Sequence, residues 1–300
     1  MPGMEVKYIS KIVVDFVLLS IVTGCIFVVK KVWPPFQRGM FCGDKSISYP
    51  YVDDSDEKVS DGALLLIGVV MPMGLICVLE WFRVRRETVG KKVVMCGRDL
   101  NSWFWAAYSA IGPFLFGCAT SQLTTDIAKY SVGRLRPHFI AICKPDWSKI
   151  NCSEPFLYVD PIPCTSDDDH RMKEARLSFP SGHASFSAYT MIYFVIYLQV
   201  RFKFKTPKLV RPFLQFVCLM MTFYTTVSRI SDYKHHWSDV LFGFSEGALV
   251  AVLVSLYVSD LFCDGSQPRS RARRHQHEGV EAVALQNCSQ SSSRSKLDFV

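Results

Sequence analysis

Residues 9–29 read ISKIVVDFVLLSIVTGCIFVV, a run in which Lys11 and Asp15 are the only charged side chains. A helix of about 20 such residues is long enough to cross the roughly 30 Å hydrocarbon core of a bilayer. The run starts close to Met1 and continues without a small-residue cleavage site, which favours a retained membrane anchor over a signal peptide. We therefore predict that this stretch is a transmembrane helix.

Five further apolar stretches follow along the chain. Together with the first, they predict an all-α, polytopic membrane protein with six transmembrane helices. Of the 300 residues, 49% are hydrophobic, and the mean hydropathy of +0.17 is high for a soluble protein of this length. The further stretches are residues 63–81, 104–123, 186–200, 210–227 and 240–262.

Basic residues form three clusters, and all three fall on one side of the membrane if each stretch crosses it once. The positive-inside rule makes that side cytoplasmic, together with both termini. The net charge of +7 therefore indicates orientation and not nucleic-acid binding. The clusters are Arg83, Arg85, Arg86, Lys91, Lys92 and Arg98; Arg201, Lys203, Lys205, Lys208 and Arg211; and Arg269, Arg271, Arg273 and Arg274.

The chain divides into a cytoplasmic N-terminus at residues 1–7, a membrane domain at residues 8–262 and a tail at residues 263–300. The tail is rich in Ser, Arg, Gln and His and too polar to bury a core, so we expect it to be disordered. Its last residues, Leu297 to Val300, fit a peptide that adds a strand to a PDZ-type domain, with an ordinary chain end as the simpler interpretation.

Four of the eleven cysteines lie in loops on the predicted non-cytoplasmic side. One or two disulfides are expected there, and the sequence leaves the pairing open. Asn151 begins an N-glycosylation sequon in one of these loops. The four cysteines are Cys42, Cys143, Cys152 and Cys164.

Lys129 and Arg136 mark the first of three polar segments at the outer ends of the predicted helices. They are two helical turns apart, so both can point the same way before Pro137 discourages further helix. Two aligned cations suit a phosphate dianion, and the planar fork of arginine can hold two of its oxygens. The alternative is snorkelling, in which both charged ends only reach the water beside the membrane.

The second segment, Pro180-Ser181-Gly182-His183, comes just before the fourth apolar stretch. Pro, Ser and Gly before a helix form a turn with an N-cap, and the free backbone N–H groups of that helix end bind anions. His183 could protonate a departing alkoxide, because the ordinary pKa of histidine, about 6.5, lets it give a proton near neutral pH. Taken alone, the tetrapeptide also fits an ordinary turn.

The third segment runs from Ser228-Arg229 to Asp239 and contains His235 and His236. A neutral imidazole can attack phosphorus when its other nitrogen donates to a carboxylate that fixes the tautomer. Asp239 follows His235 by four residues and His236 by three, so helical spacing permits either pair. A polar loop with a surface ion pair is the alternative.

With six spans, all three segments lie on the non-cytoplasmic face. They can therefore meet in one pocket with three cations, one helix N-terminus and two or three histidines, an environment that stabilises phosphoryl transfer. No cluster of Asp, Glu, His or Cys offers a set of metal ligands. We expect neither a metal nor another cofactor, and we assign the neutralisation of charge to the cations.

The three segments resemble the signature motifs of the type 2 phosphatidic acid phosphatase superfamily. They read Lys129-x6-Arg136-Pro137, Pro180-Ser181-Gly182-His183 and Ser228-Arg229-x5-His235-x3-Asp239. From Pro35 to about Asp260, the chain is similar to the animal lipid phosphate phosphatases of that superfamily. The resemblance implies a six-helix membrane enzyme with its site on the extracellular or lumenal face.

The resemblance also implies how such a site works. His235 would be the nucleophile that forms a phosphohistidine, Asp239 would orient it, and His183 would be the acid for the leaving lipid alcohol and then the base for water. Family substrates are phosphatidate, lysophosphatidate, sphingosine 1-phosphate and ceramide 1-phosphate, and turnover requires no magnesium. The phosphate would be held by Lys129, Arg136, Ser181, Gly182 and Arg229.

Several alternatives stay open. The protein could be a non-catalytic lipid-binding scaffold, or a phosphatase or phosphotransferase that acts on other phosphoesters. The plasma membrane is the expected location, with an internal membrane as the alternative, and the family is compatible with homo-oligomers. Glu246, within the sixth stretch, is expected to form a structural hydrogen bond, with a role toward substrate as the alternative.

Overall fold

The structure, a computed structural model, describes residues 2–86, 93–95, 98–100, 102–152, 156–203 and 207–262. Within these residues, helix covers five of the six predicted stretches in full and the sixth, residues 240–262, up to Val258. The helices are α1 (Pro2–Lys31); the successive α2 (Asp61–Leu65), η3 (Leu66–Val70) and α3 (Met71–Arg86); α4 (Ser102–Val132); α7 (Gly182–Arg201); α8 (Val210–Ser231); and α9 (Trp237–Leu253) with η5 (Val254–Val258).

Four of these helical stretches are long and apolar enough to cross a bilayer, within the described part of the chain. Only 6% of the apolar window of the first is buried, so its side chains face outward, as in a helix surrounded by lipid. The protein is a multi-pass membrane protein. The helices α4 and α7 are not among these four, because Ser, Thr and Tyr side chains make them less apolar. The four spans are Ser10–Lys31, Asp61–Arg86, Val210–Ser231 and Trp237–Val258.

Helix α7 packs against α4, α8 and α9, and its contact with α9 is the most extensive. A Cβ atom added to Gly243 would lie 2.5 Å from the carbonyl oxygen of Ser181, and Gly247 has as little space beside Ser185. Small residues four positions apart let the backbones of membrane helices approach in this way. The contact holds the beginning of α7, where the second polar segment lies, against the beginning of α9.

Buried hydroxyl groups join α4, α7 and α9. Oε2 of Glu246 accepts hydrogen bonds from Oγ of Ser185 and from Oγ of Ser121, the second at 3.2 Å. Thr125 donates to Ser185 at 3.0 Å. The structural hydrogen bond predicted for Glu246 is therefore confirmed, and the polar residues that make α4 and α7 less apolar have partners between the helices.

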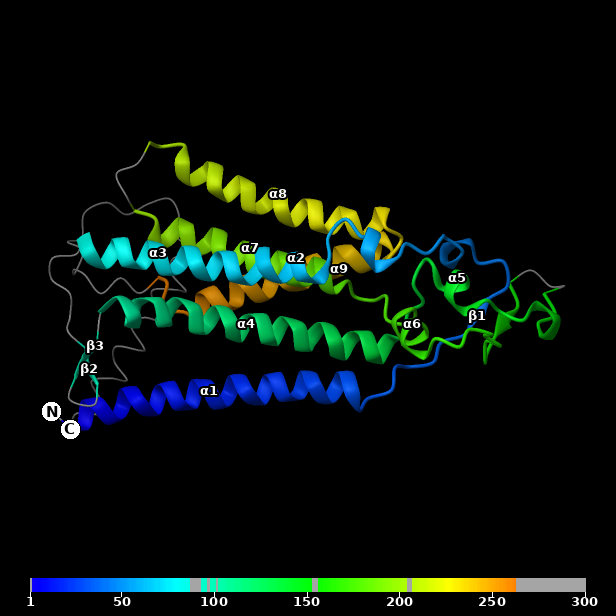
Figure 1. Ribbon diagram of the computed structural model, residues 1–300, viewed down its shortest axis with the longest axis horizontal. Coiled ribbons are helices and arrows are strands. Elements are labelled where there is room, and N and C mark those ends of the chain that lie inside the picture. The colour runs from blue at the N-terminus through cyan, green and yellow to red at the C-terminus, as the bar shows by residue number, and fades with distance from the viewer. Residues whose placement is uncertain are drawn as a thin grey trace, which may run out of the picture.

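The long helices lie side by side, and the connecting segments gather at the two ends of the bundle (Figure 1). One end carries α5, α6 and β1, and the other carries the ribbon of β2 and β3 (Figure 1). The basic end of α3, with Arg83, Arg85 and Arg86, lies at the ribbon end (Figure 1). The basic cluster and the α5–α6 segments are thus at opposite ends, as the charge pattern predicts.

Short elements and two disulfides build the end that carries α5 and α6. Cys42 pairs with Cys152, and Cys143 pairs with Cys164, which answers the question that the sequence left open. Strand β1 pairs antiparallel with β4. The elements of this end are β1 (Met40–Phe41), η1 (Lys45–Ile47), η2 (Asp54–Asp56), α5 (Phe139–Cys143), η4 (Trp147–Lys149), β4 (Tyr158–Val159) and α6 (Asp169–Glu174).

Two short strand pairs accompany a chain that is otherwise mostly helical, so the all-α prediction is confirmed in its main feature. The second pair is β2 (Val93–Met95) with β3 (Arg98–Leu100), also antiparallel. Such short ribbons carry too few residues for an alternating pattern to be recognised in sequence. The predicted tail at residues 263–300, its PDZ-type end, and Lys91, Lys92 and Lys205 lie outside the described residues.

Candidate active site

The first polar segment leaves α4 at a glycine. Helix α4 carries Lys129 and ends at Val132, and Gly133 follows with a φ of 56°. Only glycine adopts this left-handed conformation freely, and a Cβ here would collide with the backbone oxygen of Phe36. Beyond the turn, the backbone N–H of Arg136 donates to the carbonyl of Ala175 at 2.8 Å.

This turn corrects one prediction. Arg136 was expected to follow Lys129 by two turns of one helix, but the helix has ended before it. Both side chains nevertheless line the same pocket. The cations thus meet through a loop conformation that helical periodicity does not describe.

The second polar segment begins α7 as predicted. Ser181 is the N-cap residue, and its side chain accepts a hydrogen bond from the N–H of Ala184 at 3.5 Å. Its own N–H donates to the carbonyl of Asp239 at 3.0 Å. Nζ of Lys129 lies 3.4 Å from the place where a Cβ on Gly182 would stand, so the first and second segments are in contact.

The third polar segment forms the turn between α8 and α9. Arg229, in the last turn of α8, is almost fully buried and donates to Glu57 at 2.8 Å and to Asp232 at 3.2 Å. Lys234 lies in the turn and pairs with Glu57 at 2.7 Å. Buried cations are costly unless they are paired, so these carboxylates are needed to keep both charges in the protein.

His235 is held with one nitrogen toward the protein. Its Nδ1 lies 2.6 Å from the carbonyl oxygen of Ser178. A carbonyl only accepts, so Nδ1 carries the proton and Nε2 keeps its lone pair on the side of the pocket that His235 lines. Burial lowers the pKa of His235 well below its ordinary value, and the positive charges of Arg136 and Lys129 lower it further. The imidazole is therefore neutral at neutral pH, as attack on phosphorus requires.

Asp239 forms no direct hydrogen bond with His235 in the described part of the chain, so the orienting role implied by the resemblance would run through another residue. Its carboxylate accepts from the backbone N–H of His236 at 3.1 Å, lies 3.1 Å from Nδ1 of the same residue, and pairs with Arg134. The reason is local, since His236 is the N-cap of α9 and Asp239 is its third residue, so the two form a capping box. Ser178 provides the link: its Oγ donates to Asp239 at 2.6 Å, and its carbonyl accepts from His235.

His183 stands in the first turn of α7. Its Nε2 makes no hydrogen bond but lies 3.4 Å from Oδ1 of Asp61, and the ring is hydrogen bonded to the backbone of Val59. The side chain is 16% exposed and lines the same pocket as His235. A nitrogen without a hydrogen-bond partner in a pocket can exchange a proton with a bound group.

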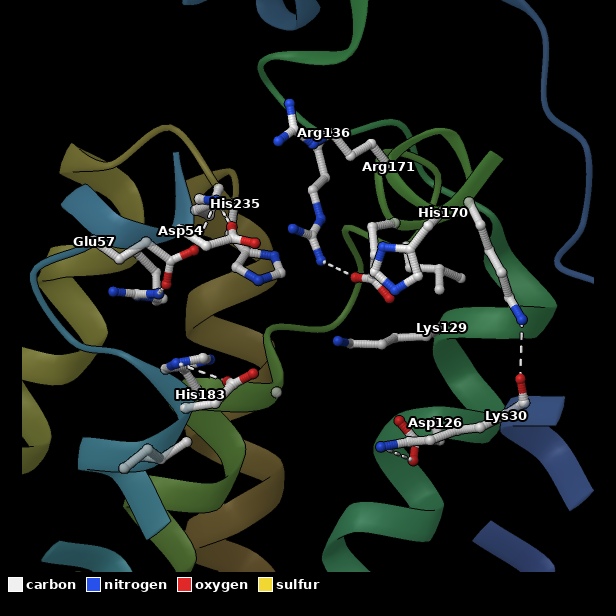
Figure 2. A pocket seen from close by; sticks show the side chains of 18 of the residues that line it. Lys30, Asp54, Glu57, Asp126, Lys129, Arg136, His170, Arg171, His183 and His235 are labelled. Carbon is white, nitrogen blue, oxygen red and sulfur yellow. Dashed lines mark hydrogen bonds and ion pairs between the residues drawn. The ribbon is translucent and has the colours of Figure 1, made fainter. Parts of the chain in front are cut away.

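The pocket is a cavity of about 840 Å³. Figure 2 shows Lys129, Arg136, His183 and His235 around a common space, with Glu57 at its side. The predicted residues that line it are Lys129, Arg136, Gly182, His183, Arg229 and His235. Ser181 and Asp239 lie behind this surface and support it through the contacts described above. No group of three or more His, Cys, Asp or Glu side chains could hold a metal ion within the described residues.

Sequence reasoning missed five residues of this region. Two of them lie within the motifs: Arg134 is between Lys129 and Arg136, and Lys234 precedes His235. A charged residue so close to a motif residue was the signal that could have identified both. The others come from segments without a motif. The five are Ser178, Arg134, Lys234, Glu57 and Glu174.

The family model described as the PAP2 superfamily matches residues 110–263, which contain all three polar segments. The chain belongs to the PAP2 superfamily. It is 48% identical over 229 residues to phospholipid phosphatase 1 of Rattus norvegicus, with 76% of this chain and 77% of the relative covered. It is 42% identical over 228 residues to phospholipid phosphatase 2 of Homo sapiens, with 76% and 75% covered.

A third relative is a putative phosphatidate phosphatase of Drosophila melanogaster, 42% identical over 241 residues that cover 76% of this chain and 63% of the relative. These similarities confirm the resemblance to the animal lipid phosphate phosphatase branch of the PAP2 superfamily. No solved structure matches the chain.

Proposed function

We propose that this protein hydrolyses lipid phosphate monoesters to inorganic phosphate and dephosphorylated lipid through a phosphohistidine on His235, without a metal. It is a lipid phosphatase enzyme by its family and by the names of its relatives. The observation that carries the mechanism is the neutral, buried imidazole of His235, which shares one pocket with Lys129, Arg136 and Arg229. The proposed substrates are phosphatidate, lysophosphatidate, sphingosine 1-phosphate and ceramide 1-phosphate.

The first step transfers the phosphoryl group to the protein. Lys129, Arg136, Arg229 and the backbone N–H groups at the start of α7 bind the non-bridging oxygens and stabilise their charge. The lone pair on Nε2 of His235 forms the N–P bond while the bond between phosphorus and the lipid oxygen breaks. The negative charge of the bound phosphate favours the protonated form of His183, which gives its proton to that oxygen, so the lipid leaves as a neutral alcohol.

The second step releases phosphate. His183, now neutral, takes a proton from a water molecule as the water oxygen bonds to phosphorus. The N–P bond breaks, and its electron pair returns to Nε2 of His235. Inorganic phosphate leaves, His183 is protonated again, and the protein is regenerated without an external reactant other than water.

We propose that six helices cross the membrane, with the pocket on the non-cytoplasmic face. The separation between the basic end of α3 and the disulfide-bonded segments supports this orientation, because disulfides persist on the oxidising side. Asn151 lies on the same side beside Cys152 and is exposed, which supports its use as a glycosylation site. The plasma membrane is the proposed location.

The test is phosphate release from lysophosphatidate in detergent micelles with excess EDTA, using wild type, His235→Ala and His236→Ala. We expect release to survive EDTA and to vanish in His235→Ala, whereas His236→Ala keeps part of it. A phosphoprotein that is labile to acid and absent only from His235→Ala identifies the intermediate. If the wild type releases nothing from several lipid phosphates, the enzyme proposal is wrong and a binding scaffold replaces it.

A further inference from the structure

Carboxylates of the protein occupy the cations that would bind phosphate. Glu57 places Oε2 2.8 Å from Nη1 of Arg229 and Oε1 2.7 Å from Nζ of Lys234. Two oxygens of one anion thus bridge two cations, as two oxygens of a phosphate would. On α6, Glu174 places Oε2 2.8 Å from Nη2 of Arg136.

These pairs balance the buried positive charges of the pocket. The side chains of Arg229 and Lys234 are 2% and 4% exposed, and that of Glu57 is 12% exposed. Charges withdrawn from water to this degree require an opposite charge nearby. Burial raises the pKa of Glu174, but the charges of Arg136 and Lys129 outweigh burial and leave the pKa below its ordinary value, so this carboxylate is also ionised.

The same pocket keeps donors for a further anion. Nε of Arg136 is buried without a hydrogen-bond partner. Lys129 forms no ion pair within 4.0 Å among the described residues. Its Nζ lies beside Gly182, at the beginning of α7. A phosphate that reaches these donors comes close to Glu57 and Glu174, and placing like charges side by side is unfavourable.

We infer that Glu57 and Glu174 are internal counter-ions, which pair with Arg229, Lys234 and Arg136 before the substrate binds and give these cations up to its phosphate. This inference rests on the proposed function, since it takes the pocket to be a phosphate site. The two carboxylates return to the cations as inorganic phosphate leaves. They therefore weaken product binding and promote its release.

The segment that carries Glu57 can release it without losing its own anchor. The backbone N–H of Lys58 donates to Asp232 at 3.2 Å, and its Nζ donates to Ser231 at 2.6 Å. The ring of Tyr49 stacks on Tyr233 at 4.7 Å between centroids. Because these contacts do not involve Glu57, its side chain can move while the segment stays in place.

The test compares Glu57→Gln and Glu174→Gln with Asp56→Asn in the full chain. Glutamine keeps the shape and an acceptor oxygen but removes the charge. Asp56 is the matched control, because it is exposed, adjoins Glu57 and forms no ion pair within the described residues. The measurements are the inhibition constant of inorganic phosphate, KM and kcat, together with the phosphate concentration that gives half of the maximal thermal stabilisation.

We expect Glu57→Gln to lower the inhibition constant of phosphate and the half-stabilising concentration by about tenfold, with the control unchanged. Glu174→Gln should lower both by less, because the side chain of Glu174 is 45% exposed and solvent screens its charge. KM should fall in parallel, and kcat should fall where phosphate release limits turnover. Unchanged or weaker phosphate binding in both variants would overturn the inference and make the carboxylates mere positioning partners of Arg229 and Arg136. The thermal measurement needs no turnover, so a wild type without activity would refute the proposed function while still testing the counter-ions.

Discussion

Replacing Gly243 with alanine tests how closely α9 must hold the turn at Ser181, where we propose that phosphate binds. The added Cβ would lie 2.5 Å from the carbonyl oxygen of Ser181 and 3.3 Å from its N and C atoms. A carbon and a carbonyl oxygen normally approach to about 3.3 Å, so α9 and the turn must separate by about 0.8 Å. All the opposing atoms belong to the backbone, so no side-chain rotation can relieve the contact.

Two effects follow from that displacement. Overpacking of this kind costs about 1–3 kcal/mol of stability. A shift of about 1 Å in a catalytic arrangement can lower the rate on the order of a hundredfold. We therefore expect Gly243→Ala to lower kcat by about two orders of magnitude while the protein still folds, because Ser181 and His183 move relative to Asp239 and its link to His235.

The assay is phosphate release from a lipid phosphate in micelles, with the melting temperature measured on the same preparation. Gly74→Ala on α3 is the control, since a Cβ there meets no atom within 4 Å and should leave kcat unchanged. A Gly243→Ala protein with the kcat and melting temperature of wild type would refute the reasoning. It would show that the backbones of α9 and the Ser181 turn can accommodate the added methyl group without displacing the residues of the pocket.

Two further predictions concern the segments around the pocket. Burial lowers the pKa of His138 to about 4, whereas in the unfolded chain it is about 6.5, so stability is lost as the pH falls from 6.5 to 4. His138→Gln should reduce this loss by up to about 3 kcal/mol, measured by denaturation at pH 7 and pH 4.5, and an equal loss in both proteins would contradict it. The Cys143–Cys164 and Cys42–Cys152 bridges join residues 21 and 110 positions apart. By the loss of chain entropy in the unfolded state, the shorter loop contributes about 3 kcal/mol of stability and the longer loop about 5 kcal/mol. Replacing both cysteines of the Cys42–Cys152 bridge with serine should therefore lower the melting temperature more than the same change at Cys143 and Cys164. The reverse order would argue against loop closure as the cause.

The sequence allowed the helices to be predicted because apolar length is a strong signal. Residues 104–123 and 186–200 were correctly placed in helix, although these segments contain polar residues such as Ser121, Ser187 and Thr190. The ends of the helices were predicted less well. Helix α4 continues to Val132, since a polar residue at a helix end can face a pocket and gives no apolar signal.

The residues of the pocket were predictable from their chemistry, but their contacts were not. Lys129, Arg136, His183, Arg229 and His235 all line one cavity. The link through Ser178, by contrast, depends on a chain segment 57 residues from His235 that turns past both α7 and α9. Such a contact leaves no spacing pattern, because it arises only when separate helices have packed.

The position of Asp239 shows why sequence spacing alone could not decide whether His235 or His236 is its partner. Residues three and four positions apart on a helix are both neighbours, and either histidine could have been the partner. The helix, however, begins only at Trp237, so His235 lies before its cap and points toward Ser178. Where α9 begins therefore decides the pairing, and the capping box of His236 and Asp239 is what fixes that beginning.

The charged residues of the pocket thus lie on two kinds of structural element, long helices and short peripheral segments. Lys129, His183 and Arg229 stand on long helices, and the α7–α9 contact at Gly243 keeps the beginnings of two helices together, so these groups have little freedom to move. Glu57 and Glu174 stand on a loop and a short helix outside the bundle. If the site binds and then releases a dianion as proposed, it benefits from this division. The fixed cations supply affinity that does not depend on rearrangement, and the carboxylates on the loop and the short helix lower that affinity again when the product leaves.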